Sequence, residues 1–232
     1  MIEIRKNIER GSAHYDWLET YHTFSFADYY DQKYLGFRSL RVINEDKVKP
    51  TKGFPLHGHK NMEIITYLIS GSLSHKDSIG NGSIINVGEV QLMSAGKGIQ
   101  HSEYNNSNEN MLHLLQIWIE PNKKNLEPSY QQKNFNQQNE KFVLLVSPTG
   151  DRNSLLINQD VKIFKALLTI NDSVSYKLHE KRHAWIQVIA GRIRLNELII
   201  LNAGDGAAVT EGDLLSFLGE DTANHFLLFD LV

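Results

Sequence analysis

The sequence predicts an all-β fold built from two similar barrels in tandem. Short segments in which apolar and polar residues alternate dominate the 232-residue chain, and Gly and Asn separate them. This spacing is typical of a β-sandwich or a β-barrel. The hydrophobic content of 41% is sufficient for a core, and the length fits one large all-β domain or two domains of ordinary size.

Ten segments are expected to be strands because they are rich in leucine, β-branched and aromatic residues. They are 39–44, 62–69, 72–77, 89–94, 112–120, 141–147, 161–168, 174–178, 185–190 and 226–231. A polar, Gln/Asn-rich stretch between the fifth and the sixth is typical of a linker. We therefore expect a first domain over 1–125, a linker over 126–140 and a second domain over 141–232.

An internal repeat supports two barrels. The segments "ITYLISGSL" and "INVGEVQLM" resemble "IQVIAGRIRL" and "LNAGDGAAV". In each copy a strand ends at a glycine, Gly71 or Gly191, and a Gly-acid turn opens a later strand. Repeated β units at this spacing favour tandem barrels, although any two antiparallel hairpins share some likeness.

Composition excludes several classes of function. A net charge of −3 provides no basic surface for nucleic acid or for an anionic membrane. The chain has no cysteine, so any metal must be bound by nitrogen and oxygen donors. The N-terminal sequence MIEIRKNIER is charged and lacks the apolar core of a signal peptide, and no apolar run is long enough to span a membrane. We expect a cytoplasmic protein.

Two short motifs carry candidate metal ligands. "GFPLHGHKNME" contains His57 and His59, and "GKGIQHSEYNN" contains His101 and Glu103. Side chains two residues apart on a strand lie on the same face, so two such pairs on neighbouring strands would present three imidazoles and one carboxylate to one point. This donor set suits a divalent first-row metal. Either pair alone is weak evidence, and Glu63 competes for the position of the carboxylate.

Several other histidine, aromatic and sulfur side chains are candidates for the site or the core. His75 is expected to be solvated or hydrogen-bonded near a hairpin end, and the strand pattern assigns no role to His113. Aromatic and sulfur side chains that could line a pocket are expected to be ordinary core; they are Phe24, Phe26, Met93 and Trp118. Aligning the repeats places Lys177 and His179 at the first pair, and Phe217 and Gly219 at the second. We therefore expect no metal in the second barrel.

The motifs also resemble a known family. "HTFSFADYYD" (22–31), "HGHKNMEIITYLISGSLSHKDS" (57–78), "VQLMSAGKGIQHSEYN" (90–105) and "LQIWIEP" (115–121) resemble the pirin family of bicupins. The resemblance implies two cupin (jelly-roll-like) barrels with a metal only in the N-terminal one. It implies the ligands His57, His59, His101 and Glu103, and it implies that Glu63 is not a ligand.

The resemblance further implies an activity. Bacterial pirins look like quercetin 2,3-dioxygenases, which open the central ring of a flavonol with O2 and release carbon monoxide. A flavonol or another polyphenol is then the expected substrate, Fe(II) the metal expected first, with Mn, Co, Ni, Cu or Zn as alternatives, and Glu103 the expected general base. Two alternatives remain open: a metal-dependent co-regulator that binds a protein partner, and a cupin enzyme acting on a different small molecule.

Overall fold

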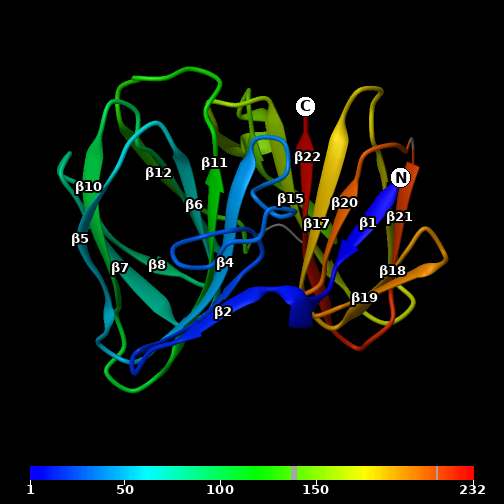
Figure 1. Cartoon of the computed structure of the whole chain (residues 1–232), viewed down its shortest axis with the longest axis horizontal. Helices are drawn as coiled ribbons and strands as arrows, with labels where there is room; N and C mark the ends of the chain where they lie inside the picture. Colours follow the sequence, from blue (N-terminus) through cyan, green and yellow to red (C-terminus); the bar gives the residue numbers. More distant parts are fainter. Residues whose placement is uncertain (137–139, 213) are drawn as a thin grey trace. The chain divides into compact units, whose positions relative to one another are not determined.

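The computed structural model describes residues 1–136, 140–212 and 214–232, and it is built almost entirely of β-strands (Figure 1). The strands are β1 (Ile2–Arg5), β2 (Gly11–His14), β3 (Leu18–His22), β4 (Leu40–Val48), β5 (Gly53–His59), β6 (Glu63–Ser70), β7 (Ser72–Asp77), β8 (Gly82–Asn86), β9 (Glu89–Ser94), β10 (Ile99–Asn105), β11 (Leu112–Ile119), β12 (Ser129–Asn134), β13 (Phe142–Ser147), β14 (Leu155–Leu156), β15 (Val161–Leu168), β16 (Ser173–Lys177), β17 (His183–Ala190), β18 (Arg192–Leu195), β19 (Ile199–Asn202), β20 (Gly206–Val209), β21 (Leu214–Gly219) and β22 (Asn224–Leu231). Two 3-10 helices, Asn7–Glu9 and Asp151–Asn153, have three residues each. No helix among the described residues is long and apolar enough to cross a membrane.

The strands form two compact units, each with one seven-stranded and one four-stranded sheet. In the first unit along the chain, the seven-stranded sheet has the order β12-β9-β6-β11-β4-β3-β2 and the four-stranded sheet has the order β5-β10-β7-β8. In the second unit, the seven-stranded sheet has the order β1-β20-β17-β22-β15-β13-β14 and the four-stranded sheet has the order β16-β21-β18-β19. The predicted all-β fold of two cupin barrels is confirmed, and all ten expected segments contain a strand.

The first barrel has a polar layer between two apolar ones. One apolar cluster contains Leu68 and Leu114, and the other contains Ile64 and packs against Trp118. Between them on β6 and β11 lie Thr66 and Gln116, which face each other across the two strands. The same row continues to neighbouring strands, because Gln116 also lies opposite Asn44 of β4 and Thr66 opposite Gln91 of β9. The large sheet therefore places a row of hydrogen-bonding groups inside the barrel.

The second barrel fills the same layer with hydrophobic side chains. Its ladder places Ile186 of β17 opposite both Leu228 of β22 and Ala207 of β20, and Phe164 of β15 opposite Leu228. These four residues occupy the positions that correspond to the polar row, and all belong to one continuous hydrophobic cluster. The two barrels thus share a topology but differ in what their interiors contain.

Two segments lie outside the boundaries expected from sequence. Residues 1–10 group with the C-terminal unit, because β1 pairs with β20 and Ile2 and Ile4 pack against its core. The expected linker 126–140 contains β12, which pairs with β9 along its whole length. Its polar composition is that of an edge strand, whose side chains face solvent on one side. Residues 137–139 of that expected linker lie outside the described residues.

Candidate metal centre

The two sequence motifs form neighbouring antiparallel strands of the small sheet in the first barrel. His101 of β10 lies directly opposite His57 of β5, and the register shifts between His101 and Glu103. The strands approach closely at Gly53, where a Cβ would lie 2.1 Å from the backbone oxygen of Glu103. A glycine at this position therefore permits the pairing that brings both motifs together.

Three of the four predicted ligands converge at one point. The ring centroids of His57 and His101 are 4.4 Å apart, and that of His59 is 4.8 Å from each of them. One ligand nitrogen from each of these residues lies within 4.8 Å of those of the other two. The strand alternation that motivated the prediction is the physical reason for this convergence.

A hydrogen bond orients His57, and burial favours the neutral forms of His59 and His101. His57 Nδ1 lies 2.7 Å from the carbonyl oxygen of Pro55, which accepts a hydrogen bond from Nδ1–H, so that Nε2 is the nitrogen available to a metal. Burial, with the neighbouring charge of His57 as a smaller cause, lowers the pKa of His59 to about 4. Burial likewise lowers the pKa of His101 to about 2, with smaller contributions from the surrounding histidines. Neutral imidazole is the form that binds a metal.

The residues fit a first-row divalent metal. The Nε2 atoms of His59 and His101 are 2.9 Å apart. Two imidazole nitrogens bound at a right angle to one ion, at about 2.1 Å, would lie about 3 Å apart. His101 Nδ1 is also buried with no hydrogen-bond partner among the described residues.

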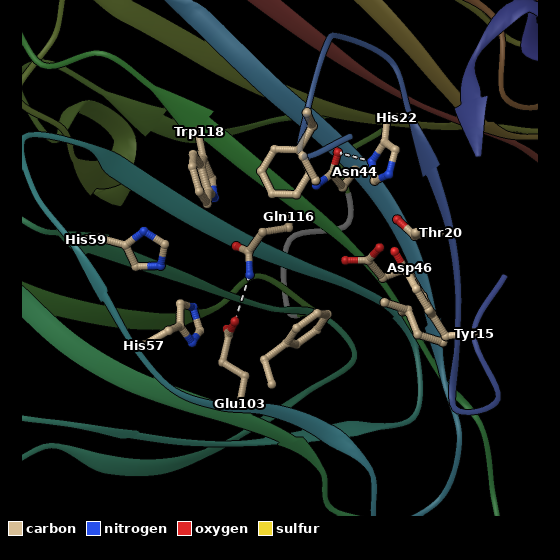
Figure 2. Close-up of a pocket in the computed structure, with 14 residues that line it drawn as sticks. Tyr15, Thr20, His22, Asn44, Asp46, His57, His59, Glu103, Gln116 and Trp118 are labelled. Atoms are coloured by element: carbon tan, nitrogen blue, oxygen red, sulfur yellow. Dashed lines mark hydrogen bonds between the residues drawn. The ribbon is translucent and has the colours of Figure 1, made fainter. Parts of the chain in front are cut away.

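Glu103 is held differently from the histidines. Its Oε2 accepts a hydrogen bond of 2.8 Å from Gln116 Nε2 (Figure 2). Its Oε1 accepts one of 3.2 Å from Thr66 Oγ1. The side chain is 2% exposed. Burial raises the pKa of Glu103 to about 7, the charge of Asp46 adds to this rise, and the two hydrogen bonds oppose it. Glu103 does not share the cluster of His57, His59 and His101.

Glu103 belongs instead to a second cluster, with His101 and His75. His75 lies opposite Glu103 in the pairing of β7 with β10, and it is completely buried rather than solvated. Its Nδ1 lies 3.1 Å from Gln91 Nε2 and its Nε2 lies 3.3 Å from Asp77. Because Gln91 can only donate through Nε2, His75 Nδ1 accepts and Nε2 donates. His101 is common to both clusters.

The remaining candidates have other partners. The carboxylate of Glu63 accepts hydrogen bonds from Ser94 Oγ at 2.8 Å and from the backbone and side chain of Asn158. His113 Nε2 lies 2.9 Å from Glu45 Oε1. Glu63 and His113 therefore each have a hydrogen-bonding role that does not involve the three converging histidines.

Sequence reasoning did not find the residues that support the site. Gln116, Thr66 and Gln91 each contact Glu103 or His75, and each stands in the middle of an apolar strand. A polar residue at an inward position of such a strand needs an internal partner. A single polar residue within an otherwise apolar strand is the signal in the sequence that could have identified them.

A pocket opens beside the histidines. It encloses about 630 Å³ of space, open solvent at its mouth included. The lining residues are Tyr15, Leu18, Thr20, His22, Phe26, Ala27, Asn44, Asp46, Phe54, His57, His59, Glu103, Gln116 and Trp118. Phe26 and Trp118 therefore line the pocket, whereas Phe24 and Met93 are buried core as expected.

Strand pairing in the two barrels gives a different alignment of the repeats from the one expected from sequence. Glu103 pairs with His75, and the matching pair in the second barrel is Phe217 with Leu195. Phe217 thus corresponds to Glu103 rather than to His101, a shift of two residues. His101 then corresponds to Leu215, whose partner on the facing strand is Tyr176.

The positions that correspond to the ligands are hydrophobic in that barrel. Leu215 and Phe217 are buried in its core, Leu178 two residues after Tyr176 is buried there too, and Tyr176 packs against them. Apolar packing therefore occupies the place where the first barrel gathers its imidazoles and its carboxylate.

Comparison with known proteins identifies the family. The pirin family matches residues 3–119, and a second family, described as the quercetinase C-terminal cupin domain, matches residues 144–231. This chain belongs to the pirin family. A quercetin 2,3-dioxygenase of Escherichia coli K12 is 42% identical over 231 residues, which cover 100% of this chain and 99% of that protein. A putative quercetin 2,3-dioxygenase of Pasteurella multocida is also 42% identical, over 237 residues that cover 100% of both chains.

Solved pirin structures have the same fold. The crystal structure of YhhW from Escherichia coli matches with a TM-score of 0.96 and 40% identity, covering 100% of this chain and 98% of that one. A second structure of YhhW, in complex with nickel(II), matches with a TM-score of 0.94 and 41% identity, covering 100% and 99%. The nickel belongs to that relative.

Proposed function

We propose that this pirin is a metal-dependent dioxygenase that opens the central ring of a flavonol with O2 and releases carbon monoxide. The observation that carries the proposal is the convergence of three imidazoles on a pocket with aromatic walls. Its full-length likeness to a relative named quercetin 2,3-dioxygenase supports the same reaction.

In the proposed site, His57, His59 and His101 hold one divalent first-row metal, with Fe(II) expected first, and Glu103, which shares a cluster with His101, is the fourth ligand. The bound metal would supply Lewis-acid chemistry, lowering the pKa of the flavonol hydroxyl and bringing the substrate together with O2. Its affinity for nitrogen donors follows the usual order among first-row metals, so the ion bound in the cell is fixed by supply as well as by these ligands.

Glu103 is proposed to remove the proton from the 3-hydroxyl group of the flavonol. Its pKa, raised by burial to about 7, is close to the pH at which the reaction would proceed, where a general base is most effective. Gln116 and Thr66 orient its carboxylate by donating to one oxygen each. Replacing those donors would leave the base present but incorrectly placed.

Aromatic side chains are proposed to hold the flat body of the substrate. Phe26 packs edge-to-face against Trp118 with ring centroids 5.4 Å apart, and Trp118 in turn contacts the ring of His59 at 4.9 Å. Phe54 adds a further aromatic wall and packs against Trp17. Such walls favour a planar aromatic ligand and reduce the access of water to the reacting atoms.

The experiment that tests the proposal is aerobic consumption of quercetin by protein reconstituted separately with Fe(II), Mn, Co, Ni and Cu. We expect the flavonol absorbance to fall while carbon monoxide is released, and both signals to vanish in His57→Ala. If no metal supports turnover despite stoichiometric binding, the dioxygenase proposal is wrong, and a metal-dependent protein partner becomes the function to seek.

A further inference from the structure

The pocket has a second polar end, away from the candidate metal centre. Figure 2 shows Thr20 and Asp46 across the pocket from His57 and His59. Thr20 of β3 lies directly opposite Asp46 of β4 in the large sheet. Asp46 is 4% exposed and lines the pocket, but it is neither a proposed metal ligand nor the proposed base.

Side chains alternate between the two faces of β4, which explains why Asp46 faces inward. Glu45 and Lys47, its neighbours in sequence, lie on the opposite face of the strand. Both have charged or ionisable partners there, Glu45 with His113 at 2.9 Å and Lys47 with Glu19 at 2.9 Å. Asp46 shares the inner face with Asn44, and no ion pair to Asp46 occurs within the described parts of the chain.

Asp46 therefore offers unused hydrogen-bonding capacity inside the pocket. Burial raises its pKa to about 6, a hydrogen bond from Thr20 opposes the rise, and the charge of Glu45 adds to it. A carboxylate can only accept hydrogen bonds, and it has about four acceptor positions. A buried carboxylate is costly unless donors surround it, so a ligand that brings hydroxyl donors would be favoured at this end.

We propose that Asp46, together with Thr20, is a specificity-determining site that accepts hydrogen bonds from hydroxyl groups on the part of a flat aromatic substrate farthest from the metal centre. The inference rests on the proposed function, because that function places the reacting oxygens of the substrate at the histidines. It adds a substrate class: aromatic compounds with hydroxyl donors at the end remote from the reacting oxygens.

The adjacent row of polar residues extends this end of the pocket. His22 Nδ1 and Asn44 Oδ1 are 2.8 Å apart, and both residues line the pocket. His22 also packs against Phe26, with ring centroids 5.4 Å apart. Hydrogen-bonding groups and an aromatic wall thus adjoin each other here, as recognition of a hydroxylated ring requires. An anionic substituent at the same place would face the charge of Asp46 and be rejected.

The test compares two probes that differ only in these donors. Quercetin and 3-hydroxyflavone have the same 3-hydroxyl and 4-keto oxygens, but 3-hydroxyflavone lacks the hydroxyl groups on the outer rings. Their dissociation constants would be measured anaerobically by calorimetry, on Ni(II)-loaded protein, so that binding is read without turnover. The variants are Asp46→Leu and Asp46→Asn, with Glu45→Gln as a control on the outer face of the same strand.

We expect Asp46→Leu to weaken quercetin binding roughly 10- to 100-fold, the usual effect of losing a hydrogen bond to a charged group, and to leave 3-hydroxyflavone almost unchanged. The dissociation constant for quercetin of Asp46→Asn, a variant that keeps one acceptor, should lie between those of the wild type and Asp46→Leu. Glu45→Gln should match the wild type. Equal losses for both probes, unchanged binding of both, or no binding of quercetin to the wild type would each overturn the inference. Discrimination by Asp46 without any turnover would sustain the inference and refute the dioxygenase proposal.

Discussion

Gln116 Nε2 donates a hydrogen bond of 2.8 Å to Glu103 Oε2, which joins the large sheet of the first barrel to the small sheet that carries the candidate ligands. Gln116 stands in the centre of the polar row, opposite Thr66 on one side and Asn44 on the other. The orientation of the proposed base is therefore set by a residue on a strand that contributes no ligand. Four predictions test this arrangement.

Gln116→Leu should shift the acidic limb of the pH–rate profile to higher pH. The amide stabilises the charged form of Glu103, so its loss should raise the pKa of Glu103 further above its usual range. A hydrogen bond to a charged group is worth about 1.5–3 kcal/mol, so kcat/KM near neutral pH should fall about 10- to 100-fold. Gln100→Leu, an exposed position on β10, is the control. An unshifted profile in Gln116→Leu would contradict the role given to this amide.

Glu103→Gln should separate metal binding from turnover. Glutamine keeps the shape of the side chain but cannot take a proton, and general-base catalysis contributes about 10²- to 10⁴-fold. We expect quercetin consumption to fall by at least about 100-fold, while metal analysis shows partial retention of the ion by the three histidines. Full activity in this variant would exclude Glu103 as the base.

Metal should stabilise the protein through the first barrel. A ligand present at 100 times its dissociation constant adds about 2.7 kcal/mol to the free energy of unfolding. Removal of the metal by a chelator should therefore lower Tm in the wild type and have little effect in His101→Ala, which binds less metal. His179→Ala in the second barrel, an exposed histidine near Tyr176, should behave as the wild type. An equal loss of bound metal in His179→Ala and His101→Ala would show that the ion is not held at the predicted site.

Asp46→Asn should make the protein more stable at alkaline pH. The folded-state pKa of Asp46, about 6, is above the ordinary value of 3.8, so the folded protein binds this proton more tightly. The resulting stability is present below about pH 4 and is lost as the pH rises through about 6. Two pKa units correspond to about 3 kcal/mol, which asparagine avoids.

Urea unfolding at about pH 8 and about pH 4 would measure this effect on metal-free protein. The advantage of Asp46→Asn over the wild type should be largest at the higher pH and should shrink at the lower one. Glu45→Gln, which changes a neighbouring carboxylate on the outer face, should show no comparable gain. If Asp46→Asn were less stable than the wild type at pH 8, the assigned burial cost would be wrong.

The sequence alone determined the fold class and the residues that could bind a metal. Apolar alternation and the repeated glycine turns predicted two β-barrels, because both depend on local spacing along the chain. The same is true of the pairs His57 and His59, and His101 and Glu103, since a period of two places each pair on one face of a strand.

The tertiary structure decided what depends on strand pairing. Residues 1–10 and the polar strand β12 are placed by hydrogen bonds to partners distant in sequence, β20 and β9, which no local pattern reveals. The alignment of the repeats shifted by two residues because Glu103 and Phe217 are matched through their pairing partners, His75 and Leu195, and not through their distance along the chain from a glycine. Gln116, Thr66 and Asp46 became interpretable only when the large sheet placed them facing the ligands or the pocket, because a polar side chain inside a barrel is defined by the groups that surround it.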